Sequence, residues 1–249
     1  MKPIGIVSAL AAEAVTLGPA ARHGAELRQL ADGALLAVSG IGRAAAAAAA
    51  RRLVLAGATA LSSFGMAGGL DPTLICGTVL LPEEVVVGDD SGSGDTVLPT
   101  SREWRQRLRA ALPDSCIVST GRLLTSARPI GQPRAKSDAW RHAGAAAVDM
   151  ESAAVAQVAG QAGVPFVALR VIVDTAADEL PMAVLAASVG GRLRVGRLIG
   201  GLLRAPGEVG ALIRLSARYR IASRVLAAVA GPGSPGRRAL VGGPGAPMS

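Results

Sequence analysis

Three carboxylates lie just outside apolar segments of this sequence, where a charge needs a physical reason. Glu13 follows the first apolar segment, Glu151 stands in the Ala-rich stretch "AVDMESAAVA", and Asp174 ends the apolar run "VALRVIVD". Carboxylates are almost never fully buried without a partner. In open α/β sheets, ligands bind outside the carboxyl ends of the strands. Together the three acids therefore predict one ligand-binding cleft.

Each acid also has a structural explanation when it is taken alone. An acid in the first turn of a helix interacts favourably with the helix dipole, which would account for Glu151. Asp174 would serve as a helix cap or a turn residue, and Asp149 is predicted to cap the helix that follows it. A functional cleft is favoured because all three acids, Glu13 included, occupy the same kind of position.

The elements that must position these acids follow from the apolar pattern. Several apolar runs are continuous rather than alternating, which is typical of strands covered on both faces. Predicted strands cover 4–10, 34–38, 60–64, 78–87, 116–119 and 165–173, and predicted helices cover 43–56, 101–111 and 149–163. Strands that alternate with helices predict an α/β fold, a single domain with a central mixed, twisted β-sheet flanked by helices.

The last quarter of the chain differs in charge. Residues 191–249 carry ten Arg and one acid, whereas the rest is close to neutral. We expect a catalytic domain over 1–205, whose last helix covers 183–203, then a basic amphipathic helical extension over 206–230, because apolar residues recur there at helical spacing. The Gly- and Pro-rich segment 231–249 is expected to be a disordered tail.

Composition excludes several classes of protein. The near-neutral main domain gives no reason to expect nucleic acid as a partner. Cys76 and Cys116 lie in separate strand-like segments, and the absence of a CxxC motif or a His/Cys cluster argues against a metal site and a disulfide framework. Without an uncharged apolar stretch of 18 residues we expect no membrane span. A first strand is favoured over a signal peptide, so we expect a cytoplasmic protein.

Two glycine-rich turns follow predicted strands, "SGIGR" at 39–43 and "SFGMAGGL" at 63–70. Glycine lets a ligand approach backbone N–H groups closely. Neither turn is a GxGxxG or a Walker A motif, and each is also explained as a structural turn. The polar loop at 88–95 is either an active-site flap or a plain connector.

These motifs resemble a known family in their order along the chain. "IGIVSALAAE", "SGIGR", "FGMAGGL", "VDMESAAVA" and "PFVALRVIVD" resemble the nucleoside phosphorylase superfamily over about residues 4–180, and most closely its 5′-methylthioadenosine/S-adenosylhomocysteine nucleosidase branch. The basic extension and "FGMAGGLDP…LLPEEVV" resemble the hopanoid-associated phosphorylases. That subgroup is held to remove adenine from adenosylhopane in hopanoid lipid biosynthesis.

The resemblance implies cleavage of a purine N-glycosidic bond. It implies that Asp174 is the general acid at N7 of the leaving base and that Glu13 activates water. Glu151 would bind the ribose hydroxyls, and Met150 would contact the sugar or base. The same resemblance places the backbone of Ala67 and Gly68 beside the ribose and base and makes Leu123 and Leu124 the apolar walls of the base site.

The sequence also departs from the family. Val173 stands where the nucleosidases have a Ser before the acid, and Met66 replaces a small hydroxyl residue in the glycine-rich turn. Arg43 is a weak candidate for a phosphate ligand. Water and phosphate therefore both stay open as the nucleophile, with Glu13 favouring water. We expect no metal and no cofactor, with inorganic phosphate as the one candidate co-substrate.

The expected partners follow from the same features. The substrate would be a small or lipid-linked nucleoside, and the family implies a homo-oligomer, commonly a dimer. The basic helix would either contact an anionic membrane surface or pack on its own domain or a second subunit. Alternative functions are a soluble 5′-methylthioadenosine/S-adenosylhomocysteine nucleosidase and a non-catalytic nucleoside-binding module.

Overall fold

The structure is a computed structural model that describes residues 3–23, 27–88, 96–181 and 209–245. Its strands are β1 (Gly5–Ser8), β2 (Ala20–His23), β3 (Leu27–Leu30), β4 (Leu35–Val38), β5 (Leu61–Gly69), β6 (Val79–Leu80), β7 (Glu84–Val87), β8 (Thr96–Pro99), β9 (Val118–Ser119), β10 (Arg122–Thr125), β11 (Ala145–Asp149) and β12 (Phe166–Asp174). Its helices are α1 (Ala11–Ala14), the 3₁₀ turn η1 (Val15–Leu17), α2 (Arg43–Leu55), α3 (Arg102–Ala111), α4 (Pro133–Ala143), α5 (Ser152–Ala162), α8 (Val209–Ala230) and α9 (Pro235–Gly242).

The described strands form one mixed sheet, as the sequence predicts. The order is β2-β3-β4-β1-β5-β11-β10-β7-β8, and β12 branches from β5 to pair with β6, which pairs with β9. β5 is the centre of the sheet, because it pairs in parallel with β1 and β12 and antiparallel with β11. Its last residues therefore lie between the ends of β11 and β12, where two of the predicted acids emerge.

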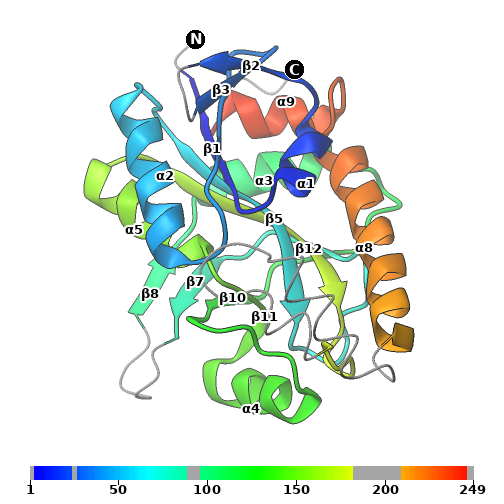
Figure 1. Cartoon of the computed structure of the whole chain (residues 1–249). Helices are drawn as coiled ribbons and strands as arrows, with labels where there is room; N and C mark the ends of the chain where they lie inside the picture. Colours follow the sequence, from blue (N-terminus) through cyan, green and yellow to red (C-terminus); the bar gives the residue numbers. More distant parts are fainter. Residues whose placement is uncertain (1–2, 24–26, 89–95, 182–208, 246–249) are drawn as a thin grey trace.

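Helices cover both faces of the sheet, which explains the continuous apolar strands (Figure 1). On one face α2 and α5 pack through small side chains, with Ala46, Ala49 and Ala50 fully buried. On the other face the core includes Trp104 of α3 and Leu226 of α8. Alanines on the inner faces of α2 and α5 let these helices lie close to the strands, so the core on their face of the sheet is built largely from small side chains.

The amphipathic helix predicted at 206–230 is α8, and its apolar side packs on the protein itself. Ala222, Leu226 and Val229 are fully buried, and α8 lies alongside β12. Figure 1 shows α8 running along one side of the domain, with α9 turning back over the end of the sheet near β2 and β3. The apolar side of α8 is therefore part of the hydrophobic core on this face of the sheet.

The prediction of a disordered tail over 231–249 is wrong for the part that the structure describes. Ser234 caps α9 by accepting the backbone N–H of Arg237 at 3.0 Å, and Pro235 occupies the first turn, where a missing N–H costs nothing. Arg237 binds Asp32 at 2.6 Å, and the indole N–H of Trp104 donates to the carbonyl oxygen of Ala239 at 3.1 Å. These contacts stabilise α9 as a helix although the segment is rich in Gly and Pro, which usually favour disorder.

Other element predictions differ in detail. The strand predicted at 78–87 is split into β6 and β7, with Pro82 between them. The predicted helix at 149–163 begins only at Ser152, because Asp149 ends β11. The helix predicted at 183–203 and most of the 88–95 loop lie outside the described residues. No helix that the structure describes is long and apolar enough to cross a membrane.

Candidate active site

The fold brings all three predicted acids to one cavity of about 190 Å³ at the carboxyl ends of β1, β5, β11 and β12. Asp174 is paired in register with Gly68, and Val148 is paired with the same glycine from the other side. α1, which follows β1, carries Glu13. The predicted site residues that line this cavity are Glu13, Ala67, Gly68, Met150, Glu151 and Asp174.

Glu13 is buried, with both carboxylate oxygens anchored. Oε1 accepts the backbone N–H of Met66 at 2.9 Å, while Oε2 accepts the backbone N–H of Leu10 at 3.1 Å and the hydroxyl of Ser8 at 3.3 Å. Burial raises the pKa of Glu13, and the nearby Arg170 guanidinium and these hydrogen bonds act against that rise. A fixed carboxylate with a raised pKa is suited to accept a proton near neutral pH.

Glu151 lies between β11 and α5 and reaches across to the "SGIGR" turn. Its Oε1 accepts the backbone N–H of Gly42 at 2.7 Å, and its Oε2 accepts the backbone N–H of Met150 at 3.3 Å. Burial and the neighbouring charge of Asp149 raise the pKa of Glu151 to about 7, although Arg170 lowers it. The glycine-rich turn therefore holds a carboxylate in place.

Arg170 is a buried cation close to Glu13 and Glu151 that sequence analysis did not identify. It forms an ion pair with Asp149 at 2.7 Å and donates to the hydroxyls of Ser63 at 2.7 Å and Ser152 at 3.0 Å. A Cβ on Gly65 would lie 2.7 Å from the Arg170 guanidinium, so glycine is needed there. The available signal was an arginine in the middle of the apolar run "VALRVIVD".

Asp149 has two roles in the structure. It accepts the backbone N–H of Ser152 at 3.1 Å at the start of α5, which agrees with the capping role predicted for it. It also accepts the hydroxyl of Thr125 at 2.7 Å and neutralises Arg170. The second role explains how this acid is tolerated among alanines, since a buried charge needs a partner.

Asp174 is held by a lysine that sequence analysis also missed. Lys136 of α4 is completely buried and forms an ion pair with Asp174. Its ammonium group also donates to the carbonyl oxygens of Thr175 at 2.8 Å and Asp178 at 2.9 Å. Burial raises the pKa of Asp174, and Lys136 opposes that rise. The polar segment "PRAKSDAW" gives no sign in the sequence that this lysine faces inward.

The structure does not bring Leu123 and Leu124 to the cavity. Both side chains are buried in the core and neither lines the site, so the prediction that they wall the base is wrong. Strand β10 lies one position further along the sheet, and the apolar lining comes from other elements. The described apolar side chains along the cavity include Ile41, Met66, Pro129, Ile130, Val148, Val173 and Leu180.

The candidate phosphate ligand Arg43 opens α2 and does not line the cavity. Among the described residues, Arg128 is the cation that lines the cavity. A second hollow of about 460 Å³ adjoins the first and shares Asp174 and Leu180 with it. The described residues contain no group of three or more His, Cys, Asp or Glu side chains that could hold a metal ion.

Fold and site together define an α/β protein with three buried carboxylates in a cleft at the ends of its strands. The family is more specific. Residues 7–199 match the Phosphorylase superfamily, and the chain belongs to that superfamily. This membership makes it an enzyme of the nucleoside phosphorylase and nucleosidase class. A search of curated protein sequences finds no significant match.

Several solved structures share this fold. The 5′-methylthioadenosine/S-adenosylhomocysteine nucleosidase of Helicobacter pylori is 19% identical, with a TM-score of 0.67 over 92% of this chain and 97% of the other. The corresponding Colwellia psychrerythraea nucleosidase, in complex with adenine, is 24% identical, with a TM-score of 0.63 over 81% and 96%. Futalosine hydrolase of Helicobacter pylori is 20% identical, with a TM-score of 0.65 over 87% and 97%.

Proposed function

We propose that this enzyme hydrolyses the N-glycosidic bond of an adenosyl nucleoside and releases adenine. The observation that carries the proposal is that Glu13, Glu151 and Asp174 line one cavity and that burial raises the pKa of all three. Titratable groups with perturbed pKa values gathered in a cleft are typical of catalytic sites. The adenine complex of the Colwellia psychrerythraea relative supports adenine as the base.

Each acid has a distinct role in the proposed reaction. The bond from C1′ to the base nitrogen breaks with its electrons moving to the base, while the ribose becomes oxocarbenium-like. Asp174 delivers a proton to the base, and Glu151 accepts the hydrogen bonds of the ribose hydroxyls and stabilises the positive charge. Water adds to C1′ and gives its proton to Glu13. The products are free adenine and the sugar hydroxyl compound, so atoms and charge balance.

Electrostatics favour water over phosphate as the nucleophile. A phosphate anion beside C1′ would lie against the carboxylates of Glu13 and Glu151. Among the described residues, the buried cation next to these acids is Arg170, which is already neutralised by Asp149. Arg128 also lines this cavity, but its side chain is exposed, so solvent screens its charge and a phosphate anion against the two carboxylates is still disfavoured. Uncharged water meets no such barrier.

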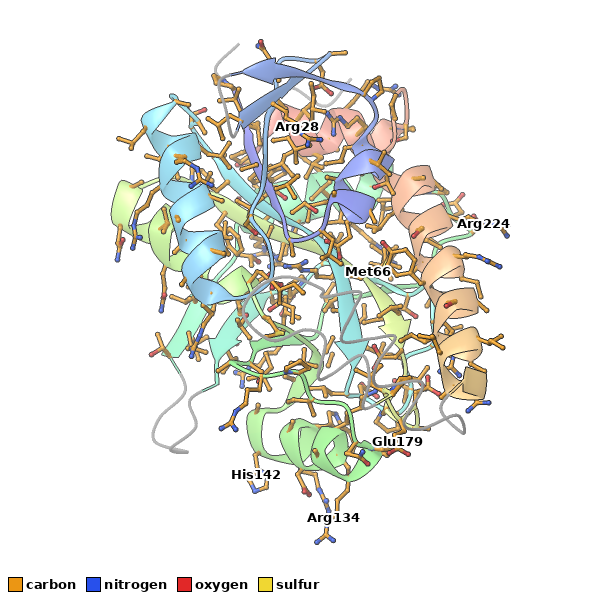
Figure 2. All side chains as sticks on the ribbon, in the orientation of Figure 1. Arg28, Met66, Arg134, His142, Glu179 and Arg224 are labelled. Carbon is orange, nitrogen blue, oxygen red and sulfur yellow. The ribbon has the colours of Figure 1, made fainter. Side chains whose placement is uncertain are left out.

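For the natural substrate we propose a lipid-linked adenosyl compound such as adenosylhopane. Met66 and Ile41 support an apolar group beside the sugar, since both line the cavity. The outer side of α8 supports contact with an anionic membrane, because Ile213 and Ile221 are exposed on a helix that also carries arginines. Figure 2 shows one of these, Arg224, projecting away from the domain.

Membrane contact is tested by flotation with anionic vesicles. Because α8 belongs to the core, deleting it would disturb the fold, so the variant Ile213→Ser with Ile221→Ser is the better probe. Trp140→Ser, which replaces an exposed apolar side chain on another helix, α4, is the matched control. We expect the double variant to float less than the wild type and the control. Equal recovery of all three would refute membrane contact through α8.

The substrate is tested by measuring adenine release from adenosylhopane, 5′-methylthioadenosine and S-adenosylhomocysteine. We expect the highest kcat/KM with adenosylhopane. A clear preference for either soluble nucleoside would replace the lipid substrate with the soluble nucleosidase function, which the fold of the Helicobacter pylori relative favours. Binding without release from any of the three would point to a non-catalytic nucleoside-binding module.

A further inference from the structure

We propose that Lys136 is a positioning residue that stores the proton which Asp174 delivers to the leaving base. The inference rests on the proposed function, because it concerns the acid of that same reaction. It extends the site to α4, a helix that sequence analysis did not connect with catalysis.

All three ammonium protons of Lys136 have acceptors. They are directed to Asp174 Oδ2, the Thr175 carbonyl oxygen at 2.8 Å and the Asp178 carbonyl oxygen at 2.9 Å. A lysine ammonium has three donors and no acceptor, so this arrangement uses it completely. The contacts fix the carboxylate at the end of β12 and also the turn that follows it. Asp174 is thereby held with its proton source in direct contact.

The other charged groups around Asp174 act less directly. Arg218 of α8 lowers the pKa of Asp174 by its charge and forms an ion pair with the Asp178 side chain. That side chain also accepts the backbone N–H of Thr175 at 2.8 Å. The Cys76 thiol on the loop before β6 is influenced by both Arg218 and Asp174. In the described part of the chain, Lys136 is the cation that bonds to the carboxylate itself.

The type of cation matters. The chain has 26 Lys and Arg residues, and only Lys2 and Lys136 are lysines. Arginine would supply the same charge but stays protonated in proteins, whereas a buried lysine can release its proton. A low-dielectric site also narrows the free-energy gap between the ion pair and its neutral form, because both charges lose their hydration. Lysine is thus the cation that can act as a proton store.

The proposed step is a transfer along the pair. As the bond from C1′ to the base breaks, a proton moves from Lys136 Nζ to Asp174 and from Asp174 to the base, so one N–H bond of Lys136 breaks, one N–H bond forms on the base, and Asp174 is again a carboxylate beside a neutral Lys136. Water supplies the hydroxyl group to C1′ and a proton to Glu13. After product release Glu13 returns its proton to solvent and the pair regains one. The net reaction is hydrolysis, with both groups restored.

The test compares pH profiles of kcat and kcat/KM for the wild type, Lys136→Met and Lys136→Arg. The matched control is Arg134→Met, which removes an exposed charge from the same helix. Figure 2 shows Arg134 pointing away from the domain. The basic limb is the part of the profile at high pH where the proton donor has lost its proton. Beyond its midpoint, activity falls about tenfold per pH unit.

We expect the basic limb at the highest pH in the wild type and in Arg134→Met, lower in Lys136→Met and lowest in Lys136→Arg. Methionine removes the stored proton but leaves the buried acid, whereas arginine keeps the acid ionised and releases no proton. We expect kcat to change and KM to change little. A Lys136→Arg limb that coincides with the wild type would overturn the proposal, because a purely structural role tolerates that substitution.

A second measurement does not need turnover. Carbon-13 NMR of the aspartate carboxyl groups, with the Asp174 signal assigned from Asp174→Asn, gives the titration of Asp174 directly. We expect this midpoint to rise by about one pH unit or more in Lys136→Met, since an opposite charge in contact lowers a carboxyl pKa by that amount. Equal Asp174 midpoints in the wild type and Lys136→Met would show that Lys136 does not act on the Asp174 carboxyl and would overturn the proposal. Failure of the wild type to cleave any nucleoside would refute the proposed function while leaving this titration decisive.

Discussion

Replacing Glu151 with glutamine should stabilise the protein at alkaline pH and abolish most of its activity. Glutamine has the same shape but no charge, so the change removes the cost of burying an ionised group. Burial and Asp149 raise the pKa of Glu151 from 4.5 to about 7. Between pH 4.5 and about pH 7, the folded state therefore keeps a proton on Glu151 that the unfolded chain has already released. Wild-type stability must fall as the pH rises through that window.

The magnitude follows from the shift. Each pKa unit corresponds to about 1.4 kcal/mol, so ionised Glu151 costs about 3 kcal/mol of folding free energy above pH 8. A glutamine carbonyl can still accept the Gly42 N–H, but the bond from the Met150 N–H is lost, which costs about 1 kcal/mol. The net gain for Glu151→Gln is about 2 kcal/mol at pH 8.5. Near pH 5 the wild-type carboxyl is largely protonated, and the gain disappears.

Urea unfolding followed by circular dichroism at pH 5 and pH 8.5 measures this difference. For a chain of this size the gain corresponds to about 5 °C in Tm at pH 8.5. The exposed Glu103→Gln on α3 is the matched control and should show no such pH dependence. If Glu151→Gln changes stability equally at both pH values, the buried carboxyl does not have a raised pKa and the reasoning fails.

Three further predictions follow from the described contacts. Asp174→Asn should keep nucleoside binding within about threefold but lower kcat by at least about a hundredfold, as measured by adenine release, and near-normal turnover would exclude it as the acid. Gly65→Ala should lower kcat/KM by about tenfold or more, because the added Cβ would lie 2.7 Å from Arg170 Nη1 and 2.8 Å from the Glu13 carboxyl. Unchanged kinetics would show that these two side chains can move aside. Arg237→Met should lower the free energy of unfolding by about 2 kcal/mol through the loss of its ion pair with Asp32, measured by urea titration, and an unchanged midpoint would mean that α9 is not anchored by this contact.

The sequence predicted the parts of the site that lie next to strong apolar runs. Glu13 and Asp174 were identified because one lies just beyond the first apolar run and the other ends the last one, and the glycine-rich turns marked where backbone approaches the cavity. β11 was missed, because "AAAVD" is made of alanines, which favour helix, and only the neighbouring strands β5 and β10 make it extended. Tertiary pairing decided its structure.

The partners of the acids could not be predicted in the same way. Arg170 and Lys136 are separated from their carboxylates by 21 and 38 residues in the sequence, and only the fold brings each pair together. Lys136 is harder to detect, since its neighbours along α4 are polar and its burial depends on the turn after β12. For the C-terminal segment, structure was present where disorder was predicted. Its high Gly and Pro content outweighed the Ser234-Pro235 pair, which is a typical helix start and begins α9.

The central claim is that water, not phosphate, attacks the sugar even when phosphate is present. A reaction in oxygen-18 water tests this claim most directly. The enzyme is incubated with an adenosyl nucleoside, inorganic phosphate and labelled water, and the sugar product is analysed by mass spectrometry. We expect free adenine and a sugar that carries one oxygen-18 atom, at a rate that does not depend on phosphate. An unlabelled sugar 1-phosphate, formed only when phosphate is present, would contradict it.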